Sequence, residues 1–273
     1  MRQFRIAILA EDQAKMGFLD RKFVAQHGLS VFIGGPPNLL FDSGPSDSFM
    51  RNAALLGIDL QTIDAVALSH GHWDHTDGLS FLKLEGDRRP LVAHPDLFAD
   101  RHKGSGEYNG TALRREALCE AFDLILTRQP HWFSEDVVFL GEIPRLNDFE
   151  AKETPFYRIT EKQKCDDFMM DDTAIAMRTD RGLVIVTGCS HAGICNITEH
   201  ARTVCDEKRV HMILGGFHLL GKKDQLSKTI DYFRENPIDH LYPMHCTDLP
   251  SLCAFQQNFG IDKLCAGDVL TVG

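Results

Sequence analysis

The sequence lacks any hydrophobic run long enough to cross a membrane. Its longest nearly apolar stretch, residues 212–221, is about half the ~20 residues that a spanning helix needs, and it contains a histidine. The first 15 residues hold only a five-residue apolar run before two acidic residues, which is too short for the core of a signal peptide. We therefore expect a cytoplasmic protein without a membrane segment.

The chain also lacks an excess of positive charge. Lys and Arg number 29 against 39 Asp and Glu, so the net charge is −10 and an anionic polymer or membrane surface would be repelled. None of the eight cysteines forms a C-x-x-C pair, and most are expected to be small core residues in a reducing cytosol. These absences favour small-molecule chemistry, with neither nucleic acid nor membrane as a partner.

Short aliphatic runs that end in polar turns recur along the chain and predict buried strands. The five runs occupy residues 38–41, 63–68, 183–186, 210–214 and 240–242, and four of the turns that follow carry a histidine. Segments with a helical apolar period lie between them, at about 46–56, 194–204, 226–233 and 250–259. Strands that alternate with helices indicate an α/β layered domain.

Residues 94–170 differ from the rest of the chain, because their apolar periodicity is weak and their turns are polar. We interpret this stretch as a loop-rich insertion or cap over the site. The whole chain, 1–273, is then expected to form a single domain.

The strongest motif is Ser-His-Gly-His-Trp-Asp-His at residues 69–75, directly after a predicted strand. Side chains at i and i+2 of an extended segment point to one side, so His70 and His72 can bind one metal ion together. Asp74 and His75 lie where the chain turns toward a helix and can face a second ion. The alternative, a surface loop that happens to be rich in histidine, requires a rare coincidence of residue types at fixed offsets.

This loop, with Leu-Phe-Asp-Ser-Gly at 40–44, resembles the metallo-β-lactamase-fold hydrolase superfamily. Segments 27–30, 68–79, 186–194, 215–219 and 243–247 resemble the branch that contains the dihydropterin-ribofuranosylaminobenzene phosphate synthase of methanopterin biosynthesis. The resemblance implies a four-layer αββα sandwich with a dinuclear metal site along one edge.

The resemblance also implies roles for individual residues. By motif position, His70 and His72 would bind the first metal, and Asp74, His75 and His245 the second. Asp42 corresponds to an aspartate that usually supports the metal loop by hydrogen bonding instead of binding the metal.

The sequence departs from the superfamily pattern in its middle. Hydrolases of the group usually place a histidine roughly twenty residues before a Gly-Asp turn whose aspartate bridges both metals, whereas this turn reads Gly-Cys-Ser-His at 188–191. His191 is our leading candidate to complete the first site, because it follows a buried strand and an imidazole suits the same metal. Asp171 or Asp172 is the reserve candidate.

Several other residues have two interpretations. Cys189 is either a thiolate ligand or, as we expect, a buried structural cysteine. His218 contacts a substrate or metal, or is structural. The turn at 188–193 is one residue away from the nucleophile pattern G-x-S-x-G, but its spacing does not match. Five basic residues are interpreted as solvated charges, with phosphate contact as the alternative: Lys103, Arg114, Arg115, Lys222 and Lys223.

These residues favour a metal-dependent hydrolase in which two divalent ions activate water, with Asp74 as the candidate catalytic residue. Zinc is the expected metal, and manganese or iron suit the same ligands. The expected substrate is a small molecule, and the branch resemblance gives weight to phosphorylated compounds. The alternatives are a transferase that condenses a dihydropterin methyl diphosphate with ribofuranosylaminobenzene phosphate, a di-iron oxidoreductase and a non-enzymatic sensor. No oligomeric state is predicted.

Overall fold

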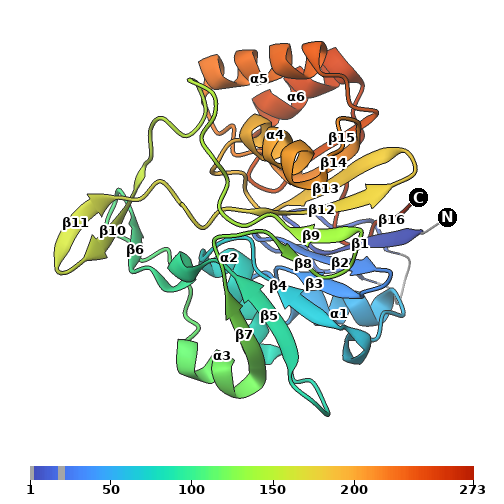
Figure 1. Cartoon of the computed structure of the whole chain (residues 1–273), viewed down its shortest axis with the longest axis vertical. Coiled ribbons are helices and arrows are strands. Elements are labelled where there is room, and N and C mark those ends of the chain that lie inside the picture. Colours follow the sequence, from blue (N-terminus) through green and yellow to red (C-terminus); the bar gives the residue numbers. More distant parts are fainter. Residues whose placement is uncertain (1–2, 18–21) are drawn as a thin grey trace.

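The computed structural model describes residues 3–17 and 22–273, which form two large β-sheets packed face to face with helices outside (Figure 1). The seven-stranded sheet runs, from edge to edge, β16 (Val269–Val272), β1 (Phe4–Ala10), β2 (Ser30–Gly34), β3 (Leu39–Phe41), β4 (Ala65–Ala67), β5 (Arg89–Ala93) and β7 (Phe122–Leu126). The six-stranded sheet runs β15 (His240–Met244), β14 (Val210–Gly216), β13 (Gly182–Thr187), β12 (Ala174–Thr179), β9 (Val137–Phe139) and β8 (His131–Trp132).

Helices cover the outer face of each sheet and complete the four layers. The seven-stranded sheet is covered by α1 (Ser48–Leu55), α3 (Arg115–Ala121) and the 3₁₀ turns η1 (Leu60–Thr62) and η2 (Asp77–Phe81). The six-stranded sheet is covered by α4 (Ile194–Cys205), α5 (Lys223–Glu235) and α6 (Leu249–Phe259). The short helix α2 (Trp73–Thr76) and the turn η3 (Pro95–Phe98) lie in connecting segments. The predicted αββα sandwich and the helices predicted at 46–56, 194–204, 226–233 and 250–259 are confirmed.

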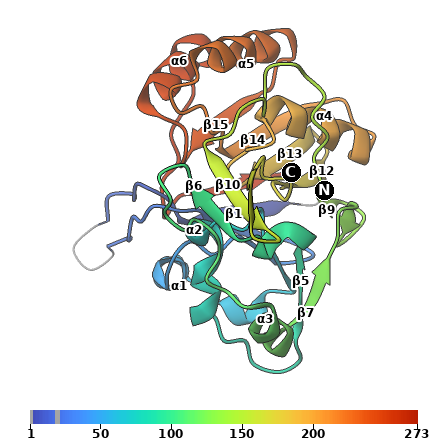
Figure 2. The same cartoon turned by 90° about the vertical axis from the view of Figure 1, so that its left-hand side faces the viewer.

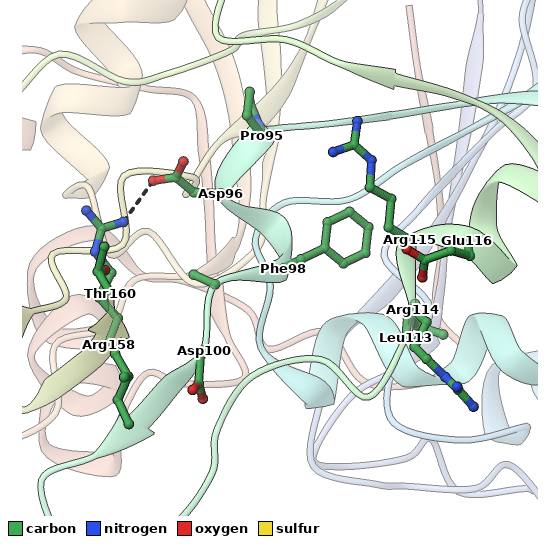
Figure 3. A pocket seen from close by; sticks show the side chains of 12 residues that line it. Pro95, Asp96, Phe98, Asp100, Leu113, Arg114, Arg115, Glu116, Arg158 and Thr160 are labelled. Carbon is green, nitrogen blue, oxygen red and sulfur yellow. Dashed lines mark hydrogen bonds and ion pairs between the residues drawn. The ribbon is translucent and has the colours of Figure 1, made fainter. Parts of the chain in front are cut away.

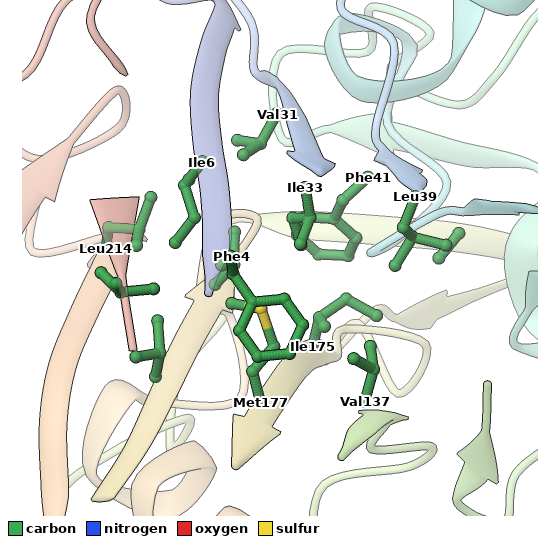
Figure 4. Packing of buried hydrophobic residues seen from close by; sticks show 14 of the residues in the cluster. Phe4, Ile6, Val31, Ile33, Leu39, Phe41, Val137, Ile175, Met177 and Leu214 are labelled. Carbon is green, nitrogen blue, oxygen red and sulfur yellow. The ribbon is translucent and has the colours of Figure 1, made fainter. Parts of the chain in front are cut away.

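Alternating side chains explain why the strands are buried on both faces. In β1, Ile6 and Ile8 point into the central core between the sheets, whereas Ala7 and Leu9 pack under the outer helices. The central core also joins Phe4 and Phe41 to Ile175 and Leu214 of the opposite sheet (Figure 4). Strands that are apolar on both faces occur in sheets covered on both sides, as here.

Residues 94–170 do not form one insertion, because several of their strands belong to the main sheets. β7 is an edge strand of the seven-stranded sheet, and β8 and β9 are at the edge of the six-stranded sheet. The remaining strands form a separate sheet in the order β11 (Gln163–Asp166), β10 (Phe156–Thr160) and β6 (Arg101–Lys103). This small sheet projects from the sandwich (Figures 1 and 2). Within residues 3–17 and 22–273, no helix is long and apolar enough to cross a membrane.

Candidate metal centre

The carboxyl ends of five strands bring the candidate residues to one edge of the sandwich. β3 and β4 run parallel in one sheet, and β13, β14 and β15 run parallel in the other. The carboxyl ends of parallel strands are the usual place for ligand sites in α/β proteins. The five residues or loops that follow these strands are Asp42, the 69–75 loop, the 188–191 turn, His218 and His245.

Backbone conformation at these strand ends is unusual. Asp42, Ser190, His218 and His245 have φ values of 57°, 60°, 44° and 48°, in the left-handed region that non-glycine residues rarely adopt. Each such residue costs about 1–2 kcal/mol. Strain of this kind persists where the surrounding structure imposes it and gathers at functional sites.

The first cluster consists of His70, His72 and His191. One nitrogen from each ring lies within 4.8 Å of the other two, and His70 Nε2 is 3.1 Å from His72 Nδ1. Ser69 Oγ donates to Asp42 Oδ2 at 2.6 Å, so at 2.8 Å it accepts the Nδ1 proton of His70. This leaves the Nε2 lone pair of neutral His70 facing the cluster. The three rings therefore have the composition and placement of a three-histidine metal site.

The second cluster consists of Asp74, His75 and His245. His75 Nε2 lies 3.2 Å from His245 Nε2, and Asp74 Oδ2 lies 3.7 Å and 3.4 Å from these two nitrogens. The opposite nitrogens donate to carboxylates: His75 Nδ1 to Asp42 at 2.7 Å and His245 Nδ1 to Asp12 at 2.8 Å. When both rings are neutral, two lone pairs and a carboxylate oxygen converge without a proton between them. In that state a divalent ion would satisfy all three ligand atoms.

The electrostatics distinguish the two clusters. Burial lowers the pKa of His70, His72 and His191 well below the usual value, and neighbouring histidines lower it further, so these rings are neutral and can act as ligands. Burial acts against ionisation of Asp74, but His75 and His245 hold its pKa well below the usual range. Burial also opposes protonation of His245, but Asp12 and Asp74 raise its pKa well above 6.5, so this ring holds a proton that a bound cation would displace.

Sequence reasoning missed three residues behind the second cluster. Asp12 pairs with His245 and also with His27 Nδ1 at 3.0 Å, and the His27 Nε2 atom is 3.5 Å from Asp74 Oδ2. Glu11 accepts a hydrogen bond from the backbone N–H of His245 at 3.0 Å. In the sequence, the only indication of this region was the His27-Gly28 pair, which lies in one of the segments that resemble the superfamily branch. Gly28 has φ 137°, and a Cβ there would lie 2.2 Å from the Asp74 carbonyl oxygen, so only glycine lets this loop approach.

Known proteins are similar to this chain in fold and in sequence. A family model described as the metallo-beta-lactamase superfamily matches residues 25–156. The uncharacterized protein MJ0448 of Methanocaldococcus jannaschii is 33% identical over 87% of this chain and 90% of its own length. The chain belongs to the metallo-β-lactamase superfamily.

Two further superfamily relatives extend the comparison. The 7,8-dihydropterin-6-methyl-4-(β-D-ribofuranosyl)-aminobenzene-5'-phosphate synthase of the same organism is 30% identical over 97% of this chain and 96% of its own length. The crystal structure of Tm1679, described as a metal-dependent hydrolase of the β-lactamase superfamily, is 29% identical with a TM-score of 0.86, and the match covers 99% of both chains. The resemblance noted in the sequence is therefore confirmed.

The reserve candidates for the first metal, Asp171 and Asp172, support the loops of the superfamily site. Asp171 holds Arg101 Nη1 at 2.9 Å and accepts the backbone N–H of Gly71, between the two histidines, at 2.8 Å. Asp172 accepts the backbone N–H of Ala192, next to His191, at 2.9 Å. Burial raises the pKa of Asp172 to about 7. The structure thus places His191, and neither aspartate, beside His70 and His72.

The opening to the clusters is narrow. A cavity of about 20 Å³, room for roughly one water, is lined by His191, His218, Lys222 and Phe156. Phe156, from the small sheet, stacks edge-on against His72 and His191 at ring distances of 5.1 Å and 5.6 Å. His218 Nδ1 is buried and has no hydrogen-bond partner within residues 3–17 and 22–273. Phe156 therefore covers the first cluster on the side of the narrow cavity.

Larger hollows lie outside the clusters, and two of them bear on access to the site. One, of about 540 Å³, adjoins the narrow cavity through Lys222 and Glu153 and also contains Lys152. The other, of about 500 Å³, lies between η3, β10 and α3 (Figure 3), and there Arg158 pairs with Asp96 at 2.9 Å. The pocket in Figure 3 shares no lining residue with the narrow cavity, so the first hollow is the better route to the site.

Proposed function

We propose that this protein is a metal-dependent hydrolase that uses a dinuclear centre to cleave a phosphorylated small molecule. The observation that carries the proposal is the pair of adjacent clusters, in which the rings of His70 and His75 are 4.2 Å apart. Each cluster offers three side chains that suit a divalent ion. The family relationship supports metal dependence independently of this geometry.

The donor atoms fit two divalent ions, with zinc as the proposed metal. His70, His72 and His191 would hold one ion, and Asp74, His75 and His245 the other. Two buried ring nitrogens, His72 Nε2 and His191 Nε2, have no hydrogen-bond partner among the described residues. Divalent ions bound here would supply Lewis acidity, which polarises a substrate oxygen and lowers the pKa of water so that hydroxide is available as the nucleophile near neutral pH.

The residues at the opening have roles in substrate binding. Lys222 forms no ion pair with any described residue, although it lines both the narrow cavity and the larger hollow. Burial lowers its pKa, so an incoming anion would replace lost solvation. His218 can hydrogen-bond a substrate oxygen through its free Nδ1. In the proposed binding mode, Phe156 moves aside, an anionic group of the substrate binds Lys222, and the scissile bond points toward the clusters.

The test combines elemental analysis with hydrolysis of a panel of phosphate monoesters, diesters and diphosphates by one preparation. We expect about two zinc ions per chain and turnover of at least one class. His72→Ala and His75→Ala are each expected to lose bound metal and more than the roughly 10–100-fold of activity that outer hydrogen-bonding partners contribute. His240→Ala, on an exposed position, serves as the control. Full metal content and activity in both site variants would contradict the proposal.

Condensation of two substrates is the second candidate, because the relative that is 30% identical over 97% of this chain is named as a synthase. In that reaction the same clusters would bind a leaving diphosphate. Hydrolysis in ¹⁸O-labelled water places the label in the product, whereas condensation requires both organic substrates and leaves no label. The isotope result therefore decides between the two candidates.

A further inference from the structure

We propose that Cys189 is a thiolate ligand shared by the two metal ions, an inference that rests on the proposed dinuclear centre. Its sulfur lies 3.2 Å from His75 Nε2. It also lies within 4.8 Å of candidate ligand atoms of His70 and His75, of His191, and of His245. These four residues come from both clusters. The sulfur therefore lies between the two sites, where the superfamily usually has an aspartate.

The surroundings of Cys189 differ from those of structural cysteines in this chain. Cys195 and Cys205 pack in the apolar cluster between the six-stranded sheet and α4. The Cys189 sulfur, on a residue only 3% exposed, instead faces imidazole nitrogens and its neighbour Cys246. An apolar side chain of similar size would fill a structural role equally well. The convergence of ring nitrogens on this sulfur is explained by a shared cation.

Two glycines allow the turn to place this sulfur in the site. A Cβ at Gly188 would lie 2.2 Å from Ser69 Oγ, so glycine lets the end of β13 approach the metal loop of the opposite sheet. A Cβ at Gly216 would lie 2.5 Å from the Cys246 sulfur and 3.2 Å from the Cys189 Cα. Glycine at the ends of β13 and β14 therefore leaves the space that Cys189 and its neighbours occupy.

Binding of the thiol involves no change of oxidation state. The S–H bond breaks, its proton leaves to solvent, and the sulfur lone pair forms the bond to the ion. A thiolate is softer than the carboxylate it replaces. It favours zinc, iron or cobalt over magnesium, calcium or manganese.

Zinc-edge X-ray absorption of the full-length, zinc-loaded protein tests the inference directly. We expect a Zn–S distance of about 2.3 Å in addition to Zn–N and Zn–O scattering at about 2.0–2.2 Å. A shared thiolate gives an average of one sulfur per zinc. Half a sulfur per zinc would place Cys189 on a single ion and overturn the sharing, and absence of sulfur would overturn the inference altogether.

Variants identify which cysteine is responsible. Cys189→Ser is expected to lose the sulfur signal and to bind both ions at least 10-fold more weakly, whereas Cys246→Ser and the buried control Cys195→Ser keep the signal. Cys189→Asp is expected to keep two ions without sulfur and to accept manganese more readily. Persistence of the signal in Cys189→Ser, or its loss only in Cys246→Ser, would refute the assignment. Circular dichroism verifies that each variant is folded.

The result also separates this inference from the proposed function. Wild-type protein that binds no metal would contradict both. Wild-type protein that binds two zinc ions, hydrolyses a phosphorylated substrate and shows only nitrogen and oxygen neighbours would contradict the role of Cys189 alone.

Discussion

A single isosteric change, Asp42→Asn, should disturb both metal clusters at once. The Asp42 carboxylate is fully buried and accepts three hydrogen bonds: from the Ser69 backbone N–H at 2.7 Å, from Ser69 Oγ at 2.6 Å and from His75 Nδ1 at 2.7 Å. In the variant, an amide NH₂ replaces one acceptor oxygen. Asparagine tolerates the left-handed backbone of this position well, so the hydrogen-bonding effect is isolated from strain.

The consequence follows from counting protons. His75 Nδ1 must then accept from the amide, which moves the ring proton to Nε2, the nitrogen that faces the second cluster. Ser69 Oγ also accepts from the amide and donates to His70 Nδ1, which moves the His70 proton to the nitrogen that faces the first cluster. Loss of an outer partner typically lowers metal affinity 10–100-fold. We expect that loss at each site, about 1.4–2.7 kcal/mol.

Competition with a chromophoric zinc chelator measures both affinities, and ¹⁵N NMR of the histidine rings reports the protonated nitrogen directly. Asp47→Asn is the control, because that carboxylate is exposed and pairs with Arg51 at 2.9 Å. Zinc affinities within twofold of wild type, with His70 and His75 still protonated at Nδ1, would refute the reasoning.

Three further changes have distinct expected outcomes. The pKa of Asp172 is about 7 in the folded protein and 3.8 when the side chain is not buried, so between about pH 4 and pH 7 the folded protein keeps a proton that the unfolded chain has lost. The unfolding free energy of the metal-free wild type therefore falls as the pH rises through this range. Asp172→Asn should therefore gain stability relative to wild type over this range, by about 4 kcal/mol at most, and a pH-independent difference in urea unfolding would contradict this. Gly28→Ala should weaken zinc binding and lower the melting temperature more than Gly57→Ala, which also has positive φ but faces open space; equal effects would argue against the close approach to Asp74. Lys222→Gln should raise KM for a phosphorylated substrate about 10-fold with kcat nearly unchanged, as expected for lost uniform binding, whereas Lys83→Gln, at an exposed position that lines neither the narrow cavity nor the adjoining hollow, should not; an unchanged KM in Lys222→Gln would show that Lys222 is a solvated charge.

The parts of the molecule that the sequence predicted are those with local signals. A buried strand followed by a polar turn is visible within about ten residues, and it located the ends of β3, β4, β13, β14 and β15. The resemblance to the superfamily implied that these turns meet along one edge, and in the structure the carboxyl ends of parallel strands lie together there. His191 was preferred to the two upstream aspartates because it follows a buried strand and an imidazole suits the same metal, and the structure places it with His70 and His72.

The parts that escaped prediction depend on contacts between distant segments. Asp12 and His245 are 233 positions apart, and neither has a neighbouring pattern that indicates the pairing. β10 and β11 are half-buried or exposed, so they lack the alternation that marks a strand in a core. The short edge strands β8 and β9 were hidden in a polar stretch for a related reason, since two or three residues are too few to establish a period.

The strained strand ends explain how such distant residues act together. A residue in the ordinary extended conformation would continue the direction of its strand. The left-handed conformation of Asp42, Ser190, His218 and His245 instead turns the chain where each strand ends. Four such residues cost about 4–8 kcal/mol in total, comparable with the whole stability of a typical domain. The flanking strands are buried on both faces and supply the packing energy that offsets this cost. The packing of the strands therefore holds the strained turns that place the candidate ligands.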